Sequence, residues 1–212
     1  MTETRRYDSA LRLAKTRRTR VRILDSARHL FLAGGYVGTT LDAVAARAEV
    51  SPQTVYNLVG SKATLFKTVY DVTLAGDDEP IPLAARPEFE RVLDALSARG
   101  SLVAYARICE LLWTRVGPLV RVATAQAAAG DPDLRAFVET IETERAIGSR
   151  NIVRMLDDRF GLRPGLTVDE GADIVWTLTG PDVVERLVER RGWSWVRYQE
   201  WFVETVHHGL FS

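Results

Sequence analysis

The sequence has little of the chemistry that catalysis and metal binding use. Among its 212 residues it holds one cysteine, Cys109, and three histidines, His29, His207 and His208. A single cysteine excludes an internal disulfide, and no cysteine or histidine stands near Cys109 to form a zinc or nucleophile pair. His207 and His208 are adjacent, so on a helix they point about 100° apart and cannot form a metal pair. We therefore expect no enzyme, no metal site and no cofactor.

Long apolar runs are absent as well. No stretch of about 18 apolar residues is available to span a membrane, and the first twenty residues lack the apolar core of a signal peptide. No segment alternates apolar and polar residues as a strand does, whereas helical spacing recurs throughout, which predicts an all-α fold. Together with the unpaired cysteine, these absences favour a cytoplasmic protein with no membrane partner.

The formal net charge is zero, but the two signs are unevenly distributed. Residues 1–70 hold twelve Lys and Arg against five Asp and Glu, a net charge of +7, which leaves −7 for the rest. Such a division indicates that one end of the chain meets a polyanion. We expect residues 1–15 to form a loosely ordered basic arm, whose Arg5, Arg6, Arg12 and Lys15 either enter a minor groove or make no defined contact.

Three helix starts follow one another in the first third of the chain. Thr39 and Asp42 have the spacing of a capping box, Ser51 precedes a proline, and Ser61 follows a glycine. Two short helices joined by a tight turn, the second of them polar on its outer face, are the layout of a helix-turn-helix. The alternative is an ordinary helical hairpin whose polar face is solvated.

The outer face of the second short helix carries side chains that suit DNA. Gln53 and Asn57 have amides that reach base edges, and Thr54 offers a hydroxyl and a methyl group. Nearby hydroxyl and ammonium groups suit phosphate oxygens. The predicted DNA-binding residues are Thr40, Ser51, Gln53, Thr54, Tyr56, Asn57 and Lys62.

A longer string of residues around these helices forms a recognisable pattern. It consists of Ile23-Leu24-Asp25-Ser26-Ala27, Phe31, Gly35-Tyr36, Thr39-Thr40-Leu41, Val44-Ala45, Ala48, Val50-Ser51, Thr54-Val55-Tyr56, Gly60-Ser61-Lys62 and Leu65-Phe66. On this string, residues 17–72 resemble the N-terminal DNA-binding domain of TetR-family transcriptional regulators. Val59 departs from the pattern, since similar members often carry an aromatic residue there.

The resemblance also has implications for the rest of the chain. It implies C-terminal helices that enclose a pocket for an unknown small-molecule effector, whose binding lowers the affinity for the operator. It further implies a homodimer in which the last two long helices pack against those of a partner. We expect a three-helix helix-turn-helix domain over residues 1–75 and a larger helical ligand-binding and dimerisation domain over residues 76–212.

Glycine, acidic residues and three prolines between these parts mark the boundary. Helices are predicted over residues 16–33, 61–75, 88–98, 101–116, 117–129, 131–160, 168–178, 183–190 and 194–210. Four of the five tryptophans lie between residues 176 and 201, which indicates either a deep core or a subunit interface.

Candidate pocket residues in these helices combine apolar area with a few polar atoms. They are Tyr105, Cys109, Trp113, Val116, Val120, Thr124 and Trp176. Simple core packing is the alternative for each of them.

One recognition helix reads only about four or five base pairs, whereas a two-fold dimer reads both halves of a palindrome about 34 Å apart. The sequence therefore predicts a ligand-responsive regulator of transcription, most simply a repressor, that binds double-stranded DNA as a homodimer. The alternative is a helical small-molecule-binding or scaffold protein whose DNA-binding head is no longer used.

Overall fold

The computed structural model describes the backbone of residues 3–212 and the side chains of residue 11 and residues 13–212. All regular elements over residues 3–212 are helices, so the predicted all-α class is confirmed. Within this range, no helix combines the length and the apolarity needed to cross a membrane. The side chains of Arg5, Arg6 and Arg12, expected in the basic arm, lie outside the described residues.

The chain divides into two compact units. The first comprises Met1–Asp78 and Pro118–Val138, and the second comprises Glu79–Gly117 and Glu139–Ser212. Two long helices, α6 and α7, contribute residues to both units. The first unit therefore contains residues 118–138, from the middle of the chain, in addition to the N-terminal helices.

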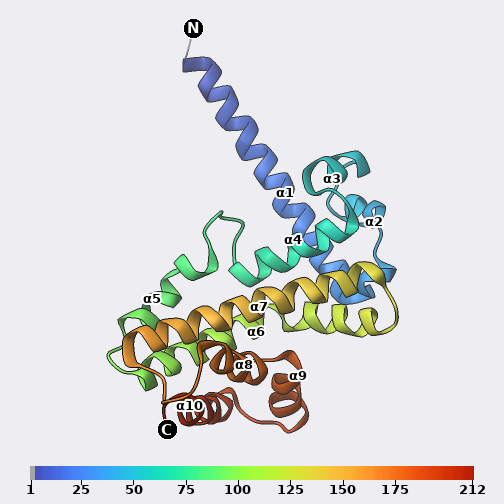
Figure 1. Cartoon of the computed structure of the whole chain (residues 1–212). Coiled ribbons are helices and arrows are strands. Elements are labelled where there is room, and N and C mark those ends of the chain that lie inside the picture. The colour runs from blue at the N-terminus through green and yellow to red at the C-terminus, as the bar shows by residue number, and fades with distance from the viewer. Residues whose placement is uncertain (1–2) are drawn as a thin grey trace. The chain divides into compact units, whose positions relative to one another are not determined.

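Four helices form most of the first unit: α1 (Glu3–Gly38), α2 (Leu41–Arg47), α3 (Pro52–Val59) and α4 (Lys62–Ala75). α2 and α3 pack on each other and on α1, and α4 lies against α1 (Figure 1). Apolar side chains at helical spacing form the core: Ile23, Leu24, Ala27, Phe31, Val44, Ala45, Val55, Leu65 and Phe66. Their burial places α3 on the outside of the bundle with its polar face exposed.

The first helix is longer than the sequence predicted. α1 begins at Glu3, so residues 3–15 are helical and the expected loosely ordered arm is wrong for their backbone. The segment is rich in Leu, Ala, Arg and Lys, which favour helix, and nothing in it breaks the helix before Gly34.

The end of α1 also differs from the prediction. The helix passes residue 33, breaks at Gly35, where φ is 73° and ψ is 175°, and continues for one turn to Gly38. A simple N-cap at Thr40 replaces the predicted Thr39–Asp42 capping box, since the hydroxyl of Thr39 donates to the carbonyl of Gly35 at 2.8 Å. Thr40 is the N-cap of α2, and its Oγ1 accepts the N–H of Ala43 at 3.1 Å.

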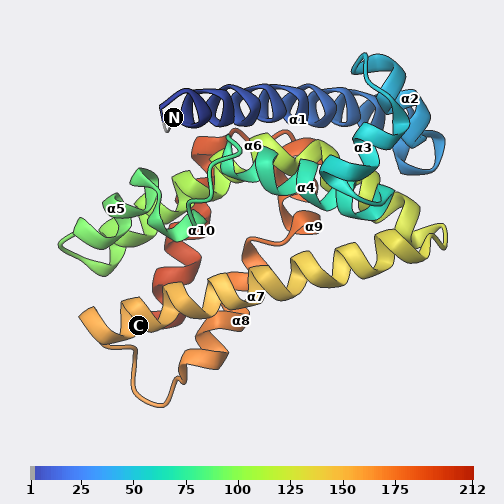
Figure 2. The same cartoon turned by 90° about the horizontal axis from the view of Figure 1, so that it is seen from above.

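The second unit is built from the remaining helices. They are α5 (Pro87–Asp94), α6 (Ala98–Ala128), α7 (Pro132–Phe160), α8 (Val168–Leu178), α9 (Pro181–Val184) and α10 (Trp195–Phe211), with a 3-10 turn at Leu83–Ala85 and a π-helical turn at Glu185–Arg190. Its core joins α6, the C-terminal part of α7, α8 and α10 (Figure 2). The buried members are Leu102, Ala106, Val153, Leu156, Val175, Phe202, Val203, Val206 and Leu210.

α6 was predicted as two helices that separate at Gly117 and Pro118, but it runs unbroken past both residues. Gly117 has no Cβ to clash with the ring of Pro118, which removes one of the penalties of a proline inside a helix. The predicted start at residue 101 is also late, because Ser97 accepts the N–H of Gly100 at 3.1 Å and thereby caps α6. α5 consequently ends at Asp94, short of residue 98.

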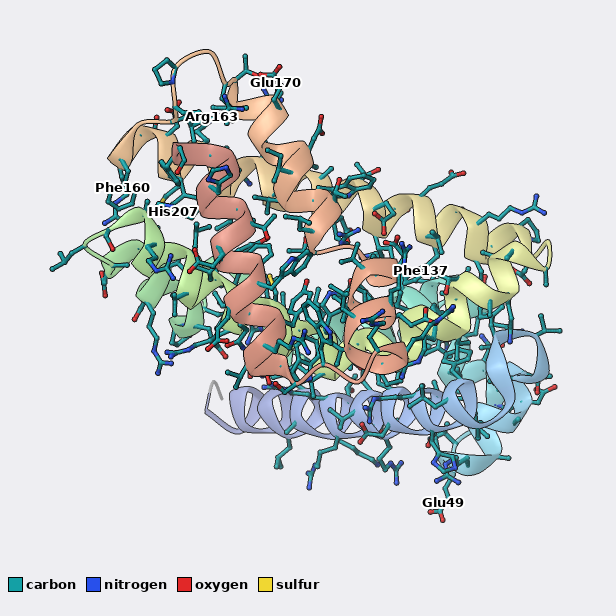
Figure 3. All side chains as sticks on the ribbon, turned by 90° about the horizontal axis from the view of Figure 1, so that it is seen from below. Glu49, Phe137, Phe160, Arg163, Glu170 and His207 are labelled. Atoms are coloured by element: carbon teal, nitrogen blue, oxygen red, sulfur yellow. The ribbon has the colours of Figure 1, made fainter. Side chains whose placement is uncertain are left out.

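The loop after α7 is fastened to the end of α10. Arg163 donates its backbone N–H to the carbonyl of Leu210 at 2.8 Å and its Nε–H to the carbonyl of Gly209 at 2.9 Å (Figure 3). Thr167 and Glu170 then form a reciprocal capping box that starts α8. The two hydrogen bonds of Arg163 satisfy carbonyls that the last turn of α10 leaves without helical partners.

Gly35→Ala should destabilise the folded chain by about 1–3 kcal/mol, because the backbone conformation at Gly35 is open essentially to glycine alone. An added Cβ would also stand 2.1 Å from Nε2 of Gln126. Gly34→Ala is the matched control, since nothing lies within 4 Å of its added Cβ, and it should be neutral or stabilising by about 0.5–1 kcal/mol. Urea unfolding followed by circular dichroism compares the two, and equal stabilities would contradict the assignment.

Candidate functional site

Local capping holds α3 rigidly in place. Ser51 is its N-cap, with Oγ accepting the N–H of Thr54 at 3.2 Å and lying 2.8 Å from the Thr54 hydroxyl. Pro52 occupies the first turn, where no amide hydrogen is needed. Val55 and Val59 are buried on the inner face, so the small residue at position 59 still packs. Ser51 and Thr54, both predicted to contact DNA, therefore also build the start of the helix.

The outer face of α3 presents two amides and a phenol to solvent. Gln53, Tyr56 and Asn57 are exposed, and 60% of the Tyr56 side chain is accessible. Nε2 of Gln53 donates to Oδ1 of Asn57 at 2.8 Å. This bond orients the two amides together while leaving the Gln53 oxygen and the Asn57 amide hydrogens available for base edges.

The N-terminus of α4 lies next in the chain. Ser61 is its N-cap and accepts the N–H of Thr64 at 3.2 Å. The ammonium of Lys62 lies 4.2 Å from the centre of the Tyr36 ring, a cation–π arrangement. Burial lowers the pKa of Lys62, and the nearby carboxylates of Asp131 and Asp133 offset part of that effect. Thr40, another predicted phosphate contact, is exposed at the start of α2.

Arg20 is a supporting residue that sequence reasoning missed. Its guanidinium donates to the carbonyl of Leu58, in the last turn of α3, at 3.2 Å and pairs with Asp78 at 2.9 Å. The side chain therefore anchors α3 to α1. No local signal could reveal this role, because both partners lie far from Arg20 in the sequence.

In the second unit, side chains from three helices converge on the end of α8. Arg145 of α7 donates to the carbonyl of Trp176 at 2.8 Å, lies over the Trp176 ring at 5.6 Å, and pairs with Glu142. A guanidinium suits this position because the C-terminus of a helix carries partial negative charge. Arg145 has no sequence signal of its own, since Trp176 is 31 residues away.

Two aromatic residues complete this arrangement. Nε1 of Trp113 donates to the carbonyl of Thr179 at 3.3 Å, and the hydroxyl of Tyr198 donates to the carbonyl of Leu178 at 2.7 Å. Trp113 and Trp176, both predicted to line a pocket, thus also take part in the hydrogen bonding and stacking that hold the end of α8.

Tyr105 and Cys109 lie one turn apart on α6 and share a hydrogen bond. Burial raises the pKa of the Cys109 thiol to about 12 and raises that of Tyr105 as well, while the charge of Arg145 partly opposes both shifts. Burial likewise raises the pKa of Tyr198. All these groups are therefore neutral at physiological pH.

The predicted pocket residues are divided between the two units. Tyr105, Cys109, Trp113, Val116 and Trp176 belong to the second unit, whereas Val120 and Thr124 belong to the first. Val116 and Val120 are buried, and the hydroxyl of Thr124 donates to the carbonyl of Val120 at 3.0 Å. Among the described residues, no group of three or more His, Cys, Asp or Glu side chains could hold a metal ion.

Comparison with known proteins identifies this arrangement of helices. The family model described as "Bacterial regulatory proteins, tetR family" matches residues 23–69, from the core of α1 through most of α4. Over these residues the chain is similar to the TetR family.

A curated relative and two solved structures extend the comparison. The HTH-type transcriptional regulator TcmR of Streptomyces glaucescens is 37% identical over 89 residues, which span 41% of this chain and 38% of TcmR. The structure titled SmeT–triclosan complex superposes with a TM-score of 0.68 at 18% identity, covering 92% of both chains. NalD of Pseudomonas aeruginosa gives 0.67 at 24% identity, covering 93% of this chain and 97% of its own. Both structures show the same fold.

Replacing Gln53 or Asn57 by Ala should cost about 1–3 kcal/mol on an operator selected from genomic DNA and little on unrelated DNA, because amides read base edges. Lys62→Ala should weaken binding to both DNAs and lower the salt slope by about 1, since it removes a phosphate contact. Anisotropy titrations at several salt concentrations measure these effects.

Lys67→Ala is the matched control for Lys62, because Lys67 also lies on α4 but pairs with Asp71 at 2.6 Å. It should leave both affinities unchanged. Uniform losses for all four variants on both DNAs would contradict the division between base-reading and phosphate-binding residues.

The Cys109 thiol should resist disulfide reagents at pH 8. A pKa near 12 lowers the thiolate fraction by about three orders of magnitude relative to an ordinary thiol, and the thiolate is the reacting species. Cys109 is the only cysteine, so absorbance of the released thiol reports on it alone. The urea-unfolded chain serves as the fast-reacting reference, and native labelling at a similar rate would disprove the burial.

Proposed function

We propose that this chain is a ligand-responsive repressor of the TetR family that binds a palindromic operator as a homodimer. Residues 1–75 act as the DNA-binding domain, and residues 76–212 bind the effector and form the dimer. The observation that carries the proposal is the exposed face of α3, where Gln53, Tyr56 and Asn57 stand clear of the core beside the capped N-terminus of α4.

Two such faces are needed because one recognition helix reads too few base pairs to select a single site in a genome. A two-fold dimer places a second α3 in the next major groove, about 34 Å away. α8 and α10 are proposed as the dimer surface. Val196 of α10 is 64% exposed, which supports this assignment.

The relatives support both repression and a response to small molecules. NalD is described as the secondary repressor of the MexAB-OprM multidrug efflux pump, and SmeT was solved as a complex with triclosan. We propose an effector that binds among the C-terminal helices and lowers operator affinity by a coupling free energy of about 1–3 kcal/mol. The pocket residues proposed are those predicted from the sequence, and the proposed compartment is the cytoplasm.

The decisive experiment selects genomic DNA fragments with the purified chain and measures binding to the recovered site. A palindrome should bind with a dissociation constant in the nanomolar range, and an isolated half-site at least about tenfold more weakly. Affinity for the palindrome should fall about 10³-fold or more between 50 and 200 mM salt, because phosphate contacts release counterions. Sedimentation at the same concentrations should show a dimer.

A well-folded dimer without salt-sensitive DNA binding would overturn the regulator assignment. That result would favour a helical small-molecule-binding protein whose DNA-binding domain is no longer used. A monomer at micromolar concentration would instead refute the palindromic mode of binding.

A further inference from the structure

A groove on the surface of the second unit runs between α5 and the N-terminal half of α6, which lie side by side (Figure 2). The hydroxyl of Ser101 on α6 donates to the carbonyl of Val92 on α5 at 3.0 Å and holds the two helices together at one end. The groove, which we call the α5–α6 groove, has a volume of about 300 Å³. This volume lies at the lower end of the range found for small-molecule sites.

The floor of the α5–α6 groove is apolar. It is formed by four residues of α6, namely Val103, Ala104, Ile108 and Leu111. Their spacing places them on one face of the helix. Ile108 is buried, whereas 37% of the Val103 side chain is accessible. The groove therefore leaves apolar surface in water, and a ligand with an apolar body would gain free energy by covering it.

This face of α6 is not the one to which the sequence assigned an effector pocket. Successive residues of a helix are about 100° apart, so Tyr105 and Cys109 lie on the other side of α6 from Val103 and Arg107. Tyr105 packs against the core that α6 forms with α7, α8 and α10. The α5–α6 groove is therefore separate from the pocket proposed above.

Two guanidinium groups line the groove without a partner of their own. Arg91 lies in the last turn of α5 and Arg107 lies on α6. Within the described part of the chain, neither takes part in a hydrogen bond, an ion pair or a ring contact. Every other arginine between residues 86 and 117 does take part in an interaction, as Arg99 does with Glu204.

The groove also contains one carboxylate, that of Glu88, which lies one turn before Arg91 on α5. Two positive charges thus face one negative charge, and the excess favours an anion. A guanidinium binds a carboxylate through two parallel N–H donors, and nearby apolar surface strengthens such a bond by keeping water away. The apolar floor alone would accept any apolar molecule, whereas the two arginines select one that carries an acid group.

We propose that the α5–α6 groove binds a small organic acid, a molecule with an apolar body and one carboxylate. The body covers the apolar floor, and the carboxylate accepts hydrogen bonds from the unpartnered arginines. The distance along α6 from Gly100 to Leu111 is about 16 Å at 1.5 Å per residue, which limits the length of the body. The site is independent of DNA binding, because every residue that lines it belongs to the second unit.

The test is isothermal titration calorimetry of the full chain with three unbranched ten-carbon probes. Decanoate should bind with a dissociation constant of about 10–100 μM, an ordinary affinity for a ligand of this size. 1-Decanol, which lacks the charge, should bind at least about tenfold more weakly, and decylammonium, which carries the opposite charge, more weakly still. Inorganic phosphate, an anion with no apolar body, should not bind at the same concentrations.

The double variant Arg91→Gln/Arg107→Gln removes both positive charges and keeps two long polar side chains. It should lower the affinity for decanoate by at least about tenfold and leave the affinity for 1-decanol unchanged. The matched control Arg99→Gln/Arg150→Gln also removes two positive charges from the second unit, but each of these arginines pairs with a carboxylate outside the groove. It should bind decanoate as the native chain does.

A third variant, Ala104→Phe, places a ring on the floor of the groove and should abolish binding of decanoate and 1-decanol alike. Circular dichroism checks that each variant keeps its helices. A native chain that binds decanoate no more tightly than 1-decanol would overturn the proposal, as would phosphate binding equal to that of decanoate. Unchanged decanoate binding by the double groove variant would also overturn it. None of these results bears on DNA binding, which the operator experiment tests separately.

Discussion

Tyr36 is buried where the chain turns from α1 towards α2, and the packing of the first unit depends on that burial. Its ring stacks near Phe31 at 5.9 Å and meets the edge of Phe66, so it joins α1 to α4. Its hydroxyl would be costly to bury alone, and the carboxylate of Asp133 satisfies it. The turn can form only because Gly35 adopts a conformation that residues with a Cβ avoid.

Hydrogen bonds also stabilise the recognition helix, α3. α3 has only eight residues, too few to be stable in isolation, so its caps and its buried valines must hold it. Ser51 secures one end, and Arg20 holds the last turn through the carbonyl of Leu58. A helix anchored in this way can expose its whole outer face to a partner without losing its structure.

In the second unit, some of the residues predicted to line a pocket make contacts that stabilise the fold. Trp113 donates to the end of α8, and Trp176 stacks beneath Arg145. Tyr198 and Phe202 of α10 are buried in the core of their own chain, which favours core packing over a subunit interface for these two residues. Trp176 and Val196 remain accessible on the helices proposed to dimerise. α8 and α10 therefore carry both buried and accessible large apolar residues, and spacing alone could not separate them.

Local chemistry in the sequence determined where α3, α4, α8 and α10 start, because N-caps act within three residues of the helix that they begin. It also determined the exposed polar face of α3, since helical periodicity assigns the inner and outer sides. Only the tertiary structure decided that Gln126 and Asp133 meet the break in α1, that Arg20 supports α3, and that Arg145 holds α8. Those pairs are separated by 31 to 97 residues in the sequence. Because only folding brings the two partners to hydrogen-bonding distance, the residues around either one do not predict the other.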